Sequence, residues 1–163
     1  MKKVIFAIFL FSGFYLHAIQ MHDWHAYLVK QCSEVGVPVG IMEAILLQEN
    51  PSFNPKATHK NKNGSVDLGL FQLNDKYIHT DFIPRYWHHE EEFRWDNPFH
   101  STYVAVRHVK WLYSKFWQEA TPRSKDFAVS LAYNCWYTAV MTGKVPRSSA
   151  DYAAAVVFSV WGE

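Results

Sequence analysis

Glu49 is the residue whose position first suggests chemistry, because it closes the apolar run ILLQE and is followed at once by Asn50-Pro51. Four and eight residues earlier lie Ile45 and Ile41, so on a regular helix the carboxyl shares the stripe that faces the core. Loss of water and the negative end of the helix dipole both favour the protonated form of such a group. A carboxylic acid that is protonated near neutral pH can donate its proton to a leaving-group oxygen. A solvated glutamate at a helix end would have the same local sequence, so this pattern alone leaves both interpretations open.

Cleavage of a glycosidic bond ordinarily needs a second carboxylate, either as a nucleophile or to activate water. Asp67 is the nearest candidate in the sequence, while Glu43 lies off the Glu49 stripe and Asp75 follows the next predicted strand. Spacing does not select among them. A hydroxyl already tethered to the reacting sugar could replace water, because its high effective molarity removes the need for a separate base. Hydrolysis and intramolecular transfer therefore both remain open from the residues alone.

Apolar residues at helical spacing predict that most of the chain is helical. The predicted helices cover residues 23–36, 38–49, 99–117, 124–134 and 149–161, with Asp23 as the N-cap of the first. Residues 51–67 contain the turn signal NKNGS, and a short apolar run follows at 68–74. We expect a loop and a small hairpin there, and irregular structure from 76 to 95. The predicted fold class is mainly α, a single compact helical domain with a small β-hairpin.

The chain has 163 residues, of which 49% are hydrophobic and 17% aromatic, enough for a packed core. Its first 18 residues, MKKVIFAIFLFSGFYLHA, have the pattern of a secretory signal peptide. Their apolar run is shorter than the roughly 20 residues that span a bilayer, although an uncleaved anchor helix is the alternative. We therefore expect a signal peptide at 1–18, a folded domain at 19–163 and no stable membrane insertion after cleavage.

Charge and histidine patterns argue against two other classes of function. The chain carries 16 Lys and Arg against 15 Asp and Glu, so no electrostatic attraction to nucleic acid is expected. Nine histidines include the run His88-His89 before Glu90, Glu91 and Glu92, but no pair has the spacing of a zinc site. We therefore predict no metal and no cofactor, and a solvated acidic segment at 88–92.

Two cysteines, Cys32 and Cys135, fall in the part expected to be exported. In an oxidising compartment they could form a disulfide. The alternative is a pair of small buried thiols, and the sequence does not decide between the two.

Three motifs carry a resemblance to a known family. The runs QENPSFNPKAT, NGSVDLGLFQLN and SLAYNCW resemble, in order, the motifs of the soluble lytic transglycosylase (SLT) domain of the lysozyme-like superfamily. That family has Glu before Asn-Pro and an Ala-hydroxyl pair, then Gly-Leu-Met-Gln, then Ala-Tyr-Asn. The chain is similar to the small members that serve secretion systems. The resemblance extends from about Pro38 to Trp161.

The resemblance implies a lysozyme-like fold whose hairpin lies beside a peptidoglycan groove. Glu49 would be the single catalytic group, first as acid and then as base, between N-acetylmuramic acid and N-acetylglucosamine, with a 1,6-anhydro product. The residues that match substrate-binding positions are Thr58, Phe71, Gln72, Tyr133 and Asn134. A periplasmic or secreted bacterial protein is implied, with peptidoglycan strands as partner and a secretion-system assembly as a further candidate partner.

Departures from the family pattern keep two alternatives open. Asn50 replaces the usual Ser, and Cys135-Trp136 stand where Gly is expected, although Gly allows backbone conformations that Trp does not. Trp136 could stack on a sugar or pack in the core, and the same holds for an aromatic group of Tyr86, Trp87 and Trp95. The alternatives are a muramidase that uses water with Asp67 as second carboxylate, and a cell-wall binding or scaffold protein without catalysis.

Overall fold

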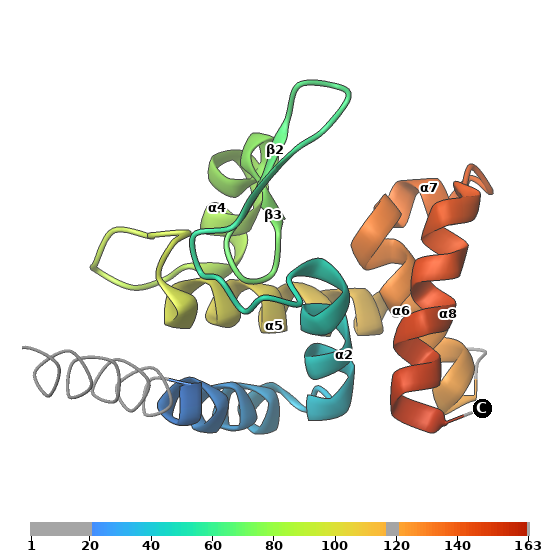
Figure 1. Cartoon of the computed structure of the whole chain (residues 1–163), viewed down its shortest axis with the longest axis horizontal. Coiled ribbons are helices and arrows are strands. Elements are labelled where there is room, and N and C mark those ends of the chain that lie inside the picture. The colour runs from blue at the N-terminus through green and yellow to red at the C-terminus, as the bar shows by residue number, and fades with distance from the viewer. Residues whose placement is uncertain (1–20, 117–120, 163) are drawn as a thin grey trace, which may run out of the picture.

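The computed structural model describes residues 21–116 and 121–162, in which helices are combined with a small antiparallel sheet (Figure 1). Residues 21–35 form the N-terminal helix. The other helices are α2 (Val39–Glu49), α3 (Asp75–Tyr77), the π-helix η1 (Ile78–Phe82), α4 (Ile83–Tyr86), α5 (Pro98–Lys115), α6 (Pro122–Cys135), α7 (Tyr137–Met141) and α8 (Arg147–Trp161). The strands are β1 (Thr58–Lys60), β2 (Val66–Leu68) and β3 (Leu73–Asn74). The predicted fold class, mainly helical with a small β element, is confirmed.

Helix α2 ends at Glu49, as the Asn50-Pro51 pair predicts. Helix α5 begins at Pro98 after the N-cap Asn97, next to its predicted start at 99. Helix α6 begins at Pro122 after the N-cap Thr121, earlier than the predicted start at 124. The prediction that Asp23 caps the first helix is wrong, because residues 21 and 22 are already helical.

The apolar stripe of α2 lies in the core. Ile41 and Ile45 are fully buried, and so is Met42, among buried residues of the N-terminal helix and α5. Helix α8 packs against both α2 and α6. In Figure 1 the sheet and α4 lie on one side of α2, and α6, α7 and α8 lie on the other. The C-terminal end of α2 is therefore held between the two sides.

The sheet has the order β1-β2-β3, and both pairs are antiparallel. Thr58 pairs with Leu68 and Asp67 with Asn74, so Asp67 lies in the central strand. The NKNGS run forms the β1–β2 turn, in which Gly64 has a φ of +81°. The predicted hairpin is present and is extended by one short strand.

The expectation of irregular structure from 76 to 95 is wrong in its first part, where α3, η1 and α4 follow one another. Ile78, Phe82 and Tyr86 are buried at four-residue spacing, which is a helical stripe of only three members. Pro84 and a π-helical turn interrupt the regular hydrogen-bond pattern, which hides that stripe in the sequence. Helix α7 was not predicted either, since five residues give no readable period.

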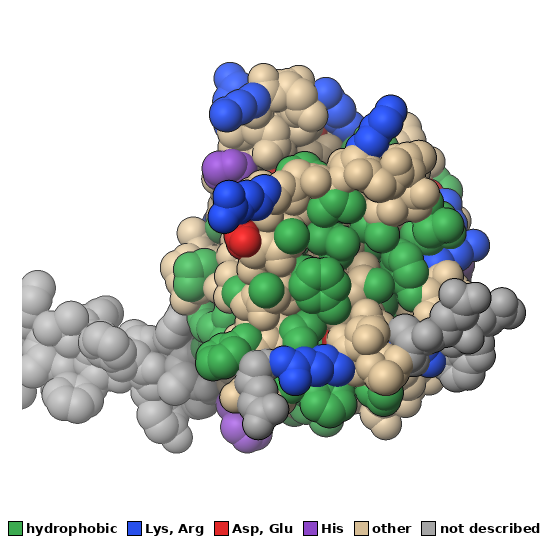
Figure 2. All heavy atoms as spheres, turned by 90° about the vertical axis from the view of Figure 1, so that its right-hand side faces the viewer, with side chains coloured by type: hydrophobic (Ala, Val, Ile, Leu, Met, Phe, Trp, Pro, Cys, Tyr) green, Lys and Arg blue, Asp and Glu red, His purple; other side chains and the backbone are tan. Residues whose placement is uncertain are grey.

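Figure 2 shows hydrophobic side chains gathered on the face of the molecule that is turned to the right in Figure 1. Phe158 and Trp161 of α8 are among the exposed large hydrophobic residues. Every helix within residues 21–116 and 121–162 is too short or too polar to span a lipid bilayer. The predicted signal peptide at 1–18 lies outside the described residues.

The two cysteines are free, so the disulfide that the sequence left open is not formed in this structure. Cys32 is fully buried in the core, where burial raises the pKa of its thiol to about 11. Cys135 is only half-buried at the end of α6, and its thiol interacts with Ser149 of α8. The two thiols therefore lie in different surroundings, one in the hydrophobic core and the other beside α8.

Candidate active site

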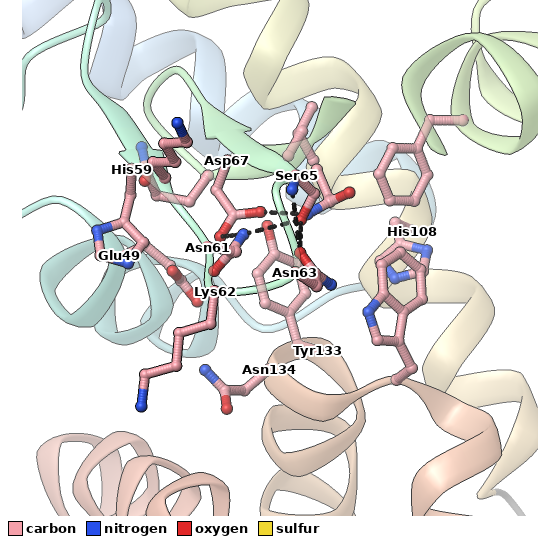
Figure 3. Close-up of a pocket in the computed structure, with 16 residues that line it drawn as sticks. Glu49, His59, Asn61, Lys62, Asn63, Ser65, Asp67, His108, Tyr133 and Asn134 are labelled. Atoms are coloured by element: carbon pink, nitrogen blue, oxygen red, sulfur yellow. Dashed lines mark hydrogen bonds between the residues drawn. The ribbon is translucent and has the colours of Figure 1, made fainter. Parts of the chain in front are cut away.

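A pocket of about 670 Å³ opens beside the end of α2 (Figure 3). The β1–β2 hairpin forms one of its walls, and the C-terminal end of α6 contributes to another. It is lined by Glu49, by His59–Asn63, Ser65 and Asp67 of the hairpin, by Gln72–Asn74, and by Phe82, His108, Tyr133, Asn134 and Trp136. Most of the sequence-predicted site residues therefore meet in one place.

Glu49 is the last residue of α2 and is only partly exposed. Loss of water on burial raises the pKa of its carboxyl to about 7. The Tyr152 hydroxyl of α8 opposes this rise, and the charge of Asp67 adds to it. The Tyr152 hydroxyl is buried and makes no hydrogen bond of ordinary geometry within the described residues, although it lies close enough to act on Glu49. Glu49 can therefore hold a proton near neutral pH.

Asp67 lies in the same pocket, on β2, among polar side chains of the hairpin. Asn61 Nδ2 donates to Asp67 Oδ2 at 2.8 Å, and Asn74 Nδ2 donates to Oδ1 at 2.6 Å. Both amides also donate to Ser65 Oγ, at 3.1 and 2.9 Å. Figure 3 shows this network beside Glu49. Both oxygens of Asp67 are thus held by donors from its own sheet.

The other two carboxylates that spacing left open do not line the pocket. Glu43 Oε1 lies 2.7 Å from His25 Nε2 on the outside of α2. Asp75 Oδ1 accepts a hydrogen bond from Val66 N at 2.9 Å and so supports the sheet. Of the three candidates, only Asp67 lines the pocket together with Glu49.

Gln72, Tyr133 and Asn134 line the pocket, as the resemblance implied. Gln72 has a φ of +48°, and its side-chain amide donates to Gly69 O at 2.8 Å. The Tyr133 hydroxyl donates to the carbonyl of Phe71 at 2.8 Å, and burial raises its pKa well above the usual value. Asn134 is exposed at the end of α6, and Figure 3 shows its side chain at the mouth of the pocket.

Two of the residues expected to bind substrate do not line the pocket. Phe71 is fully buried in the hydrophobic core, so only its backbone carbonyl supports the site, through Tyr133. The apolar ring gains more by packing in the core than by facing a polar groove. Thr58 is exposed on the edge strand β1, where its backbone pairs with Leu68. No hydrogen bond joins its hydroxyl to Glu49 within the described residues.

Asn50 joins the end of α2 to the sheet. Its amide Nδ2 donates to Asn54 O at 2.7 Å and to Gly69 O at 3.5 Å, and its Oδ1 accepts from Ser52 Oγ at 2.9 Å. Oδ1 also accepts from the backbone N–H of Asn54 at 3.2 Å. Asn50, which stands where the family usually has Ser, therefore ties the residue after Glu49 to the loop and to Gly69.

Several lining residues were not predicted as site residues. The sequence predicts Asn61, Asn63, Ser65 and Asn74 only as residues of a turn or a short strand. The amide and hydroxyl side chains on both sides of Asp67 are the signal in the sequence that indicates a polar site. His108 comes from the core face of α5, where burial lowers the pKa of its imidazole to about 4. Its Nδ1 lies 3.2 Å from the Tyr86 hydroxyl, so it is a neutral packing residue.

Trp136 follows α6 in a backbone conformation with φ 72° and ψ 142°, a region that is essentially restricted to glycine. Such a conformation costs about 1–3 kcal/mol for a residue with a side chain. The centroid of its ring lies 4.1 Å from that of Tyr77. The ring of Phe82 is nearly parallel to it, with 6.0 Å between the ring centroids and 15° between the ring planes. The position at which the family has Gly therefore has a backbone conformation typical of glycine, but carries a large ring.

The aromatic group Tyr86, Trp87 and Trp95 does not line the pocket. Tyr86 is buried, and Trp87 packs on His100 and Tyr103 away from Glu49. Their role is packing, one of the two interpretations that the sequence left open. Within the described part of the chain, no group of three or more His, Cys, Asp or Glu side chains could hold a metal ion.

Comparison with known proteins agrees with this geometry. Residues 27–154 match the transglycosylase SLT domain. The chain belongs to the SLT domain family. The helices and small antiparallel sheet of this SLT domain fit the lysozyme-like fold.

A second similarity is shorter. Over 32 residues, 20% of its length, the chain is 56% identical to lysozyme c-1 of Anopheles gambiae. The match spans only 23% of that lysozyme. No solved structure matches the chain significantly.

Proposed function

We propose that the protein is a peptidoglycan lytic transglycosylase that cleaves the β-1,4 bond between N-acetylmuramic acid and N-acetylglucosamine. The observation that carries this proposal is Glu49, a carboxyl whose pKa is raised to about 7 beside an open polar pocket in an SLT domain. A group with such a pKa is protonated in a large fraction of molecules near neutral pH, yet can release its proton during the reaction.

In the proposed reaction Glu49 donates its proton to the bridging oxygen, and the bond between that oxygen and C1 of the muramic residue breaks. Positive charge develops at C1, where the carboxylate of Asp67 in the same pocket lowers its energy. The 6-hydroxyl of the same sugar then bonds to C1, and its proton passes to Glu49. The acid is regenerated, and the product has a 1,6-anhydro end.

The remaining pocket residues bind the substrate in this proposal. Gln72, Tyr133 and Asn134 come from two sides of the pocket and bear the amide and hydroxyl groups that recognise N-acetyl sugars. Gln72 and Tyr133 are themselves oriented by hydrogen bonds to Gly69 and Phe71. Binding groups held in this way keep the bridging oxygen within reach of Glu49.

A second candidate function is a muramidase that uses water. It is favoured by the presence of Asp67 in the pocket, with both carboxylate oxygens accepting hydrogen bonds from side-chain amides. The partial match to a lysozyme points the same way, although it spans a small part of that protein. In that mechanism Asp67 would form a covalent intermediate or stabilise the charge at C1 while water completes the reaction.

The test is digestion of purified peptidoglycan sacculi in water enriched in heavy oxygen, with mass analysis of the released fragments. A transglycosylase gives anhydro ends that are one water lighter than reducing ends and contain no heavy oxygen. A muramidase gives reducing ends that incorporate it. Glu49→Gln should abolish either product, whereas Glu43→Gln, a change on the outer face of the same helix, should not. Binding to sacculi without turnover in the wild type would instead support the non-catalytic scaffold.

Export and recruitment are also proposals. The first 18 residues support export to the periplasm or the exterior, where peptidoglycan is accessible. A secretion-system assembly as partner is supported by the resemblance to small secretion-associated members. Fractionation of cells that produce the full chain, with N-terminal sequencing of the product, tests the predicted cleavage after Ala18.

A further inference from the structure

Trp136 is the feature of the pocket that the proposed reaction does not use. Among the described residues it is the only tryptophan that lines the pocket, next to Tyr133 and Asn134. The same ring also lines a smaller hollow of about 300 Å³ together with Tyr77, His108 and Trp111. Trp136 therefore borders both hollows.

The ring of Trp136 is fixed by aromatic contacts from other elements. Tyr77 of α3 lies 4.1 Å from it, and Phe82 of η1 lies 6.0 Å away and nearly parallel. His108 of α5 completes this support at 6.4 Å. The ring is nevertheless only half-buried. It is thus a rigid aromatic surface that still has contact with solvent.

The backbone of Trp136 adds an independent observation. Glycine could adopt its φ of 72° and ψ of 142° without strain. The turn from α6 into α7 could therefore be formed by a residue without a side chain. The strain is maintained because the surrounding contacts hold the ring. Strained residues beside a pocket are a recognised sign that the side chain serves the site.

We propose that Trp136 is a saccharide-stacking residue, which binds the apolar face of an N-acetylhexosamine ring in the pocket. The chemistry fits, because pyranose rings present axial C–H groups to an indole face, while the side-chain amide of Asn134 is placed to meet the N-acetyl group. The inference rests on the proposed function for its substrate class. It concerns binding, not bond cleavage.

The test measures binding of chitopentaose by calorimetry in the Glu49→Gln background, where binding is separated from turnover. Adding Trp136→Ala should weaken binding about tenfold, and adding Trp136→Phe should weaken it less. The matched control is Trp111→Ala, which removes a ring of the same aromatic cluster from outside the pocket. It should leave the affinity unchanged. Equal affinity with and without the Trp136 ring overturns the proposal.

A spectroscopic measurement keeps the test decisive if Trp136→Ala does not fold. Saturating chitopentaose should perturb the tryptophan absorption of the Glu49→Gln protein, and Trp136→Phe should abolish that difference band while Trp111→Phe retains it. A band that persists in Trp136→Phe overturns the inference. Sacculus cleavage by the wild type is scored separately, so a protein that binds through Trp136 but never cleaves refutes the proposed reaction alone. Absence of any binding to chitopentaose overturns the stacking role.

Discussion

Glu49 and Asp67 face one pocket from two different parts of the molecule. Glu49 ends a helix whose inner stripe is fully buried, and loss of water dominates the behaviour of its carboxyl. Asp67 lies on a strand whose neighbours supply amide donors to both of its oxygens. The same functional group therefore has two different surroundings, and the proposed reaction gives the two carboxyl groups different tasks.

The two carboxyl groups also differ in how their surroundings affect the free energy of ionisation. In the helical region burial removes water from the Glu49 carboxyl, which raises the free energy of its ionised form. The sheet region satisfies Asp67 with short hydrogen bonds inside a hairpin of polar residues. The variants described next change Glu49, Asp67 or a glycine of the sheet region.

The largest expected effect is on activity. Glu49→Gln should lower the rate of sacculus digestion by at least about a thousandfold, because no other group in the proposal supplies the proton. Asp67→Asn should lower it less, by about ten- to a hundredfold, because it removes only a stabilising charge. Release of soluble fragments measures both. If Asp67→Asn costs as much as Glu49→Gln and the fragments have reducing ends, the two carboxylates share the chemistry as in a hydrolase.

The next effect is on stability as a function of pH. The pKa of Glu49 is about 7 in the folded protein, against 4.5 ordinarily, so the folded state holds its proton longer and loses stability as pH rises through that window. Glu49→Gln avoids this loss, and should be more stable than the wild type by about 2 kcal/mol at pH 8 but not at pH 4. Urea unfolding at the two pH values measures the difference. A constant difference at both would mean that Glu49 is not desolvated.

Another effect on stability concerns the contact between Gly69, which follows β2, and Trp95, which precedes α5. Gly69 has a φ of +77°, and a Cβ there would lie 2.4 Å from the carbonyl oxygen of Trp95. Gly69→Ala should therefore destabilise the protein by about 2–4 kcal/mol. Gly64→Ala is the matched control, since Gly64 has a similar φ of +81° with nothing near its Cβ position. It should cost only about 1–2 kcal/mol. Similar losses in thermal unfolding would show that the Trp95 contact yields easily.

The smallest effect is the influence of one carboxylate on the other. The charge of Asp67 raises the pKa of Glu49, but less than burial does. In Asp67→Asn the falling limb of the rate against pH should therefore move to lower pH, while remaining well above the range of an ordinary glutamate. The residual activity of the variant, measured across the pH range, tests this. A limb that does not move would show that the two groups are electrically independent.

Sequence reasoning located the catalytic candidate because its signals are local. The stripe of Ile41 and Ile45 and the stop at Asn50-Pro51 define where Glu49 lies on α2, and the structure agrees. Helices with long periodic stripes, such as α5, were predicted within a few residues for the same reason. The gathering of Gln72, Tyr133 and Asn134 came from the resemblance and is reproduced by the fold.

What the sequence could not supply depends on contacts between distant segments. The choice of Asp67 over Glu43 and Asp75 required the register of the sheet, which three short strands do not encode in their period. Phe71 was misplaced because neighbouring glycine and positive-φ residues break the alternation that would indicate which side chains face the groove. The support of Trp136 by Tyr77 and Phe82 joins residues more than 50 positions apart.

Asn50 has a practical consequence for exchanging parts between relatives. Its side-chain amide donates hydrogen bonds both to Asn54 in the turn after Glu49 and to Gly69 at the end of β2. The shorter side chain of serine, with a single hydroxyl hydrogen, could not make both bonds. Replacing Asn50 by the common serine would leave the carbonyls of Asn54 and Gly69 without this donor. Moving α2 with Asn50 into another scaffold would leave the amide donor without these acceptors. The end of α2, the turn at 50–54 and the β1–β2 hairpin therefore have to be transferred together.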